Sequence, residues 1–186
     1  MKNLKTIFTN AATMPIFIAL LVLNGCKSDD TSKKVDEQEL LTTVRLTYTN
    51  QVNITDIVKV TWKDIDGAGG AAPIIDNLNL KANTTYNVML EVLDESKTPA
   101  VNKTPEIFSE GVQHQFFYAS ALLSVSYADK DTKNLPIGLA TSQKTGAIGD
   151  GKLKITLKHQ PNLKSATSTI ATGETDIEVE FNVSVK

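Results

Sequence analysis

Cysteine and histidine are scarce in this chain of 186 residues, which contains one cysteine and two histidines. A single cysteine cannot form an intrachain disulfide, and it excludes zinc or iron–sulfur sites built from several thiolates. Basic residues are not in excess, because 19 Lys and Arg stand against 21 Asp and Glu and the formal net charge is −2. Binding to nucleic acid needs a cationic surface that neutralises phosphates, so nucleic acid is not an expected partner.

The apolar run near the N-terminus is short. Residues 16–23 form an uninterrupted apolar stretch of eight residues, whereas a membrane-spanning helix needs about 20. Lys2 and Lys5 precede this stretch, and together they have the arrangement of a secretory signal peptide. The stretch ends in Leu23-Asn24-Gly25-Cys26, which resembles the lipobox of bacterial lipoproteins, although Asn24 departs from the usual small residue. The resemblance implies a signal peptide over residues 1–25, cleavage before Cys26 and lipidation of Cys26.

The segment 26–39 is expected to be a lipidated cysteine followed by a flexible acidic tether. Residues 27–39 are almost entirely Lys, Asp, Glu, Gln, Ser and Thr, with Val35 as their one aliphatic residue. Such a segment cannot bury enough surface to offset its ordering entropy. Lys27-Ser28-Asp29-Asp30 resembles the surface-export signal of lipoproteins from the Bacteroidota. We therefore expect anchoring to the outer membrane through the lipid, facing the cell exterior, with a periplasm-facing location as the alternative.

Residues 40–186 are predicted to form a single all-β domain. Apolar and polar side chains alternate there with a period of two, which is typical of strands with one face in a core and one in water. The clear alternating segments are 44–48, 58–62, 86–92, 123–127, 153–157 and 177–185, and weaker ones cover 74–80, 112–118 and 137–143. The prediction is a two-sheet antiparallel sandwich of immunoglobulin-like character with about eight or nine strands. A lipocalin-like barrel is the alternative.

One helical turn is expected, over residues 104–111. Thr104 can cap its N-terminus, Pro105 suits the first helical position, and Gly111 can end it.

Catalytic motifs are missing from the sequence. It contains no Gly-x-Ser-x-Gly motif, and lipidation would consume its only thiol. His114 and His159 could serve as bases, but no partner at a diagnostic spacing accompanies either of them. We therefore expect that the protein is not an enzyme.

The two histidines are candidate ligands for a divalent metal ion. His114 shares a strand side with Phe116, and His159 continues the side of Leu157, so both should project toward the core near strand ends. Neutral imidazole is a good transition-metal ligand, and the Glu110 carboxylate could complete such a site. The alternative is a pair of half-buried histidines that hydrogen-bond to backbone groups.

Two acidic loops are weaker candidates for a cation site. Asp64 and Asp66 lie in one loop, Asp129 and Asp131 in another, and calcium takes six to eight oxygen ligands from such segments. Neither loop has the full EF-hand spacing, and Asp side chains in turns often bond their own backbone. The residues Glu174, Asp176 and Glu178 should share the outer side of a strand, either as a solvated face or as an interaction surface.

The domain also resembles a family of small flavobacterial lipoproteins, often labelled "type 1 periplasmic binding fold superfamily protein". The matching stretches cover nearly the whole domain: 60–67, 80–86, 114–117, 136–139, 157–161 and 173–179. Gln113 departs from the family, which usually has an acidic residue before the first histidine. The resemblance implies a lipid-anchored protein and brings no established activity.

The predicted function is therefore that of a lipid-anchored outer-membrane or cell-surface lipoprotein. It would act as a non-enzymatic binding or accessory module that serves an outer-membrane transporter in an uptake system. A metal-binding lipoprotein that uses the two histidines is one alternative, and a structural or adhesive surface protein is another.

Overall fold

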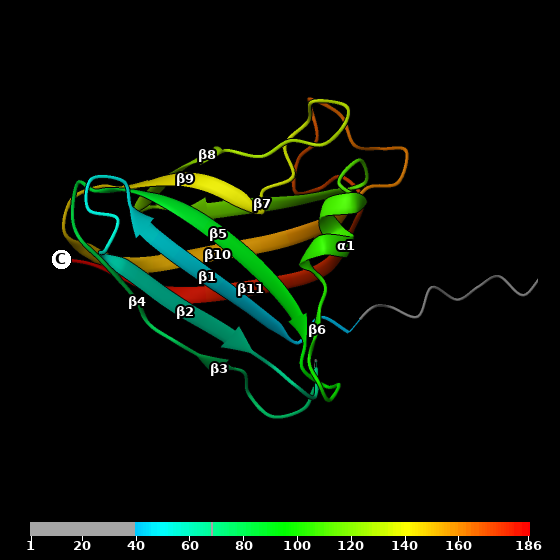
Figure 1. Ribbon diagram of the computed structural model, residues 1–186, viewed down its shortest axis with the longest axis horizontal. Helices are drawn as coiled ribbons and strands as arrows, with labels where there is room; N and C mark the ends of the chain where they lie inside the picture. The colour runs from blue at the N-terminus through cyan, green and yellow to red at the C-terminus, as the bar shows by residue number, and fades with distance from the viewer. Residues whose placement is uncertain (1–39, 68) are drawn as a thin grey trace, which may run out of the picture. The chain divides into compact units, whose positions relative to one another are not determined.

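Figure 1 shows the computed structural model, which describes residues 40–67 and 69–186. The predicted signal peptide, the lipidated Cys26 and the tether lie outside the described residues. In the described part of the chain, no helix is long and apolar enough to cross a membrane.

The strands form two sheets. Six strands of the larger sheet lie in the order β3 (Ile74–Ile75), β2 (Ile57–Lys63), β1 (Thr43–Asn50), β5 (Thr85–Asp94), β9 (Ala140–Thr145) and β8 (Leu123–Tyr127), and β6 (Val101–Asn102) also pairs with β5. The smaller sheet has the order β4 (Leu78–Leu80), β11 (Glu174–Val185), β10 (Gly149–His159) and β7 (His114–Ser120). All pairs are antiparallel except β4 with β11.

The predicted all-β, two-sheet sandwich is confirmed, and the barrel alternative is wrong because the sheets stay separate and open. The structure has eleven strands within the described residues, more than the eight or nine predicted. The difference comes from β3 and β6, which are only two residues long and too short to show alternation. The weak segment 74–80 divides into β3 and β4, and the two other weak segments lie two or three residues too early.

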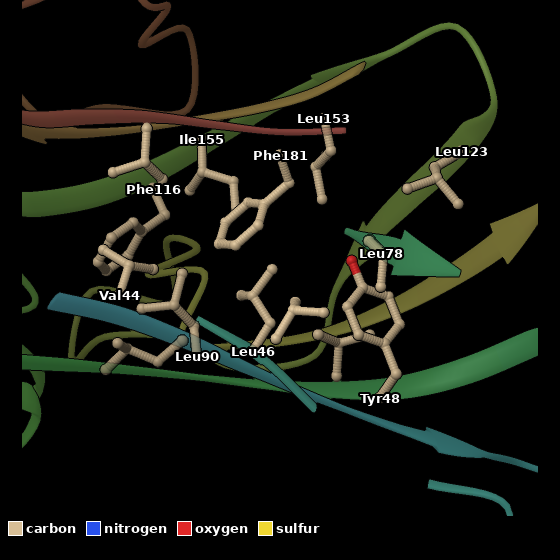
Figure 2. Packing of buried hydrophobic residues seen from close by; sticks show 14 of the residues in the cluster. Val44, Leu46, Tyr48, Leu78, Leu90, Phe116, Leu123, Leu153, Ile155 and Phe181 are labelled. Atoms are coloured by element: carbon tan, nitrogen blue, oxygen red, sulfur yellow. The ribbon is translucent and has the colours of Figure 1, made fainter. Parts of the chain in front are cut away.

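The core lies between the two sheets, where alternation places the apolar side chains. Figure 2 shows Ile155 and Phe181 of the smaller sheet pointing toward Leu46 and Leu90 of the larger one. All four are at most 2% exposed. Burying such a side chain contributes about 1.5–3 kcal/mol, so this layer holds the two sheets together.

The predicted helical turn is present as α1 (Thr104–Ser109), with Pro105 in its first turn. The predicted capping role of Thr104 is wrong, because Lys103 occupies the N-cap position and makes no side-chain cap bond. The Thr104 hydroxyl accepts a hydrogen bond of 2.9 Å from the Val92 backbone N–H instead. It therefore fastens α1 to β5 rather than closing the helix end.

The two ends of the sandwich carry different features (Figure 1). β1 starts at Thr43, so the chain enters the domain at one end, where α1 also lies. At the opposite end, the loops after β1, β4, β7 and β9 meet and bond to one another. Hydrogen bonds of 2.9–3.0 Å join Gln51 to Thr85, Asn83 to Gly146, and Gly146 to Leu122. We call these the entry end and the loop end.

Candidate functional site

A pair of stacked histidines lies at the entry end of the smaller sheet. The antiparallel register of β7 and β10 sets His114 directly opposite His159. Their rings are nearly parallel, with an interplanar angle of 14° and ring centroids 4.8 Å apart. Sequence alternation predicted the strand side of each residue, but only the strand pairing brings the two rings together.

Two carboxylates approach His114 from different elements. Glu110, the residue after α1, places Oε2 3.7 Å from His114 Nδ1. Asp176 of β11 places Oδ2 3.6 Å from His114 Nε2. The cluster therefore combines side chains from the end of α1 and from three strands.

Asp176 reaches the histidines because β11 contains a β-bulge. Leu157 pairs with Ile177, but the next residue, Lys158, pairs with Thr175, so Asp176 is an extra residue without a partner position in the ladder. A bulge bends the strand locally and re-aims a side chain. The expectation that Asp176 shares an outer face with Glu178 is therefore wrong. Glu178 does face outward, where it accepts bonds of 2.7 Å from Lys154 and 3.0 Å from Thr156.

The tautomer of His114 follows from its neighbour. Nδ1 lies 3.2 Å from the Glu110 carbonyl oxygen, which can only accept a hydrogen bond. Nδ1 therefore carries the hydrogen, and Nε2 of the neutral ring carries the lone pair. Burial lowers the pKa of His114 below its ordinary value, and the neighbouring His159 adds to this, outweighing the opposite effect of Asp176. Burial of the ring thus favours the neutral form of His114.

The predicted ligand set of His114, His159 and Glu110 is not assembled. Among residues 40–67 and 69–186, no three His, Cys, Asp or Glu side chains are grouped so that they could hold a metal ion. The lone pairs of an imidazole lie in its ring plane, and two stacked rings do not aim them at a common point. Glu110, moreover, lies on the Nδ1 side of His114, where the nitrogen carries hydrogen. The structure instead brings Asp176 to the Nε2 side.

Reasoning from the sequence missed Lys164, which bonds to the backbone of His114. Its side chain is 1% exposed, and its ammonium group donates bonds to Gly111 O at 2.6 Å, His114 O at 2.9 Å and Asp131 Oδ2 at 2.9 Å. Lys164 thereby fastens the segment between β10 and β11 to the start of β7. No pattern distinguishes it from the exposed lysines of the chain.

The four loop aspartates are engaged by backbone N–H groups rather than grouped as cation ligands. Asp64 accepts a bond from Gly67 N, and Asp66 accepts one from Ala71 N, which lowers the Asp66 pKa. Asp129 accepts bonds from three consecutive N–H groups, those of Gly138, Leu139 and Ala140. Asp131 accepts bonds from Lys133 N, Leu135 N and the Lys164 ammonium. The Asp residues therefore stabilise turns. Among the described residues they are not grouped so that they could hold a metal ion, and the calcium interpretation stays a prediction from the sequence.

Comparison of the chain with protein-family models, with curated proteins and with solved structures gave no match. The resemblance to the flavobacterial lipoproteins therefore stays a prediction from the sequence.

Proposed function

We propose that the chain is a lipid-anchored outer-membrane lipoprotein whose sandwich acts as a non-enzymatic binding module on the cell surface. It would serve an outer-membrane transporter as an accessory protein. The observation that supports this proposal is the position of the loop end, which lies opposite the end where β1 begins at Thr43. A lipid at Cys26 would hold the entry end toward the membrane and turn the loop end outward.

The length of the sandwich separates the two ends. β1 has eight residues and runs from the entry end to the loop end. A strand rises about 3.3 Å per residue, so the loop end stands roughly 26 Å from the point of entry. In a lipid-anchored chain, that distance would separate the loops from the lipid headgroups.

The loop end exposes aliphatic side chains. Val52 is 96% exposed, Ile54 72% and Ile148 77%, and they lie in the loop between β1 and β2 and the turn between β9 and β10. The loop end also has a shallow hollow of about 450 Å³, whose lining includes Asn83, Leu122 and Gly146. Aliphatic side chains held out on loops lose their contact with water when a partner covers them, which favours association.

Anchoring can be tested with Cys26→Ala in the full chain. We expect the native protein to fractionate with the outer membrane and to be digested by a protease added to intact cells. The variant should leave the membrane fraction. Recovery of the native protein in the soluble fraction would contradict lipid anchoring. Protection of the native protein from protease until the cells are lysed would contradict its location on the cell surface.

Partner binding can be tested by purification from detergent-solubilised membranes. The chain with Val52, Ile54 and Ile148 all changed to Asp should lose a co-purifying outer-membrane transporter that the native chain retains. Ile74→Asp is the matched control, because Ile74 is equally exposed at 72% but lies on the edge strand β3. Recovery of the native chain without a transporter, or equal loss in the control, would refute the binding role of the loop end.

A further inference from the structure

We propose that the free edge of β8 is a binding site for an extended, uncharged polypeptide segment of another molecule. The segment adds a strand to the larger sheet, so its main chain supplies hydrogen bonds and its alternate side chains supply specificity. The evidence for the edge does not depend on the proposed function. Only the choice of another molecule over a second copy of this chain rests on it.

The backbone bonds around β8 show which of its residues face β9. β8 is the last strand of the larger sheet and pairs with β9 (Figure 1). Just outside the strand, Gly146 N–H donates to the Leu122 carbonyl, and Ala128 N–H donates to the Ala140 carbonyl, both at 2.9 Å. Backbone groups along an antiparallel strand point alternately to one neighbour and to the other. The even-numbered residues from 122 to 128 therefore bond to β9, and the odd-numbered ones face away from it.

Leu123, Val125 and Tyr127 thus direct their N–H and C=O groups to the outer edge. Within the described part of the chain, none of these backbone groups takes part in a hydrogen bond. The neighbouring Ser124 and Ser126 are exposed, and so is Tyr127. The edge is therefore open to water, and a strand laid against it can bond to three residues in succession.

The long strands at the other edges are covered or carry charge. At the edge of β7, Phe116 N–H donates to the Ile137 carbonyl at 2.7 Å. At the edge of β2, Asp76 bonds to both backbone groups of Thr61 at 2.9 Å, and the next residue that faces this edge is Lys59. Covering segments and lysines are devices that prevent unwanted strand pairing. β8 has neither, which sets it apart as a docking edge.

The side chains along β8 define the chemistry of the segment. Residues 121–128 contain no charged side chain. Alternation places Leu123, Val125 and Tyr127 on the inner side of the strand and Ser124 and Ser126 on the outer side. Apolar pairs and hydroxyl pairs stabilise neighbouring strands. The segment that fits therefore alternates apolar and uncharged polar residues, because a charged side chain would face no opposite charge on β8.

The hollow of about 450 Å³ at the loop end begins at this edge. Its lining includes Leu123 and Ser124 of β8 and Lys144 of β9. A segment that pairs with β8 and continues past Leu123 reaches this hollow. The edge and the hollow together thus form one extended site.

A second copy of the chain is excluded by the direction of β8. When the same edge of two copies meets in one sheet, the copies are related by a half-turn and the two strands are antiparallel. The long axes of the two sandwiches would then be antiparallel as well, with their entry ends pointing in opposite directions. The proposed lipid anchor holds the entry end of every chain toward one membrane, so the segment must come from another molecule.

The test uses the full chain purified in detergent and a fluorescent peptide of alternating Val and Thr residues that is long enough to span β8. Fluorescence anisotropy should show saturable binding. The same peptide with a methyl group on every backbone nitrogen should bind at least about tenfold more weakly, because it can no longer donate hydrogen bonds to β8.

Val125→Pro locates the site. It removes an N–H that faces the peptide and leaves the bonds to β9 in place, so the peptide should bind at least about tenfold more weakly. Lys59→Pro is the matched control, because it removes an N–H at the edge of β2, and its affinity should stay within about twofold of the native value. In hydrogen exchange of the native chain, the peptide should slow the Val125 and Tyr127 amides but not the Ser126 amide, which already bonds to β9.

Four results would overturn the proposal. They are absence of saturable binding by the native chain, equal affinity for the methylated peptide, equal loss of affinity in Val125→Pro and Lys59→Pro, and a dimer in sedimentation whose Val125 amide exchanges slowly without peptide. The last result would assign the edge to a second copy. If Val125→Pro fails to fold, the methylated peptide and the exchange of the native chain decide the matter. Peptide binding in detergent does not depend on anchoring, so its failure is distinguishable from a failure of the Cys26→Ala test.

Discussion

Replacing Lys164 with Met should destabilise the domain far more than any exposed lysine substitution. Met has a similar length but no charge and no donor. The change leaves three acceptors without the ammonium group: the Gly111 carbonyl, the His114 carbonyl and one oxygen of Asp131. The side chains of Lys164 and Asp131 are both 1% exposed, so water does not readily replace the lost bonds.

The expected loss of unfolding free energy is about 3–5 kcal/mol, which is typical of removing one partner from a buried ion pair. Asp131 would keep its bonds from Lys133 N and Leu135 N, and these limit the loss. For a domain near 150 residues, 1 kcal/mol corresponds to about 2–4 °C in the melting temperature. We therefore expect a decrease of about 10 °C.

The assay is urea unfolding followed by circular dichroism, with Lys152→Met as the matched control. Lys152 also forms an ion pair, at 3.0 Å from Glu180, but both side chains are about half exposed. Exposed pairs contribute about 0–1 kcal/mol, so the control should lose at most that much. The double variant Asp131→Asn/Lys164→Met should be less destabilised than the sum of its two single variants, because it no longer buries an unpaired carboxylate.

Equal effects of Lys164→Met and Lys152→Met would refute this reasoning. Additive effects of the Asp131 and Lys164 substitutions would refute it as well, because the two groups would then not interact.

Three further predictions concern other parts of the fold. Gly173→Ala should lower the free energy of unfolding, measured in urea, by at least about 2 kcal/mol more than Gly69→Ala does. Both glycines have a positive φ, but only at Gly173 would an added Cβ lie 2.1 Å from the His159 carbonyl oxygen. Equal losses in the two variants would contradict this. Tyr48→Phe should lower the free energy of unfolding by about 1–3 kcal/mol in the same assay. The substitution removes the 2.9 Å bond from the Tyr48 hydroxyl to Gln143 Oε1 and leaves a fully buried acceptor unpaired. A loss below about 0.5 kcal/mol would count against this prediction. Burial alone would raise the pKa of Asp131, but the Lys164 ammonium and two backbone N–H groups hold it below its ordinary value. The stability that this carboxylate adds is therefore present above pH 4 and lost as the pH falls through its lowered pKa, and unfolding of Asp131→Asn at several pH values should show a weaker acid dependence than the native chain.

The acidic candidates show where reasoning from alternation fails. Strict alternation gives Glu174, Asp176 and Glu178 one common strand side, and the bulge at Leu157/Lys158 breaks this rule at Asp176. A bulge depends on how two strands settle against each other, so a single strand's sequence does not reveal it. The loop aspartates were ambiguous for a different reason. Asp residues occur both in cation sites and in turns, and only the backbone geometry around them distinguishes a cation site from a turn.

The sequence by itself predicted the longer strands, most of their inward and outward faces and the helical turn near residues 104–109. A period of two is a local property of an extended chain, and the apolar side must face a core wherever that core lies. Only the tertiary structure decided that His114 and His159 stack, that Asp176 joins them and that Lys164 is buried beneath them. Those contacts join residues 45–62 positions apart in the chain. They depend on strand register, a bulge and the packing of a long loop, all of which are set by the fit of the whole domain.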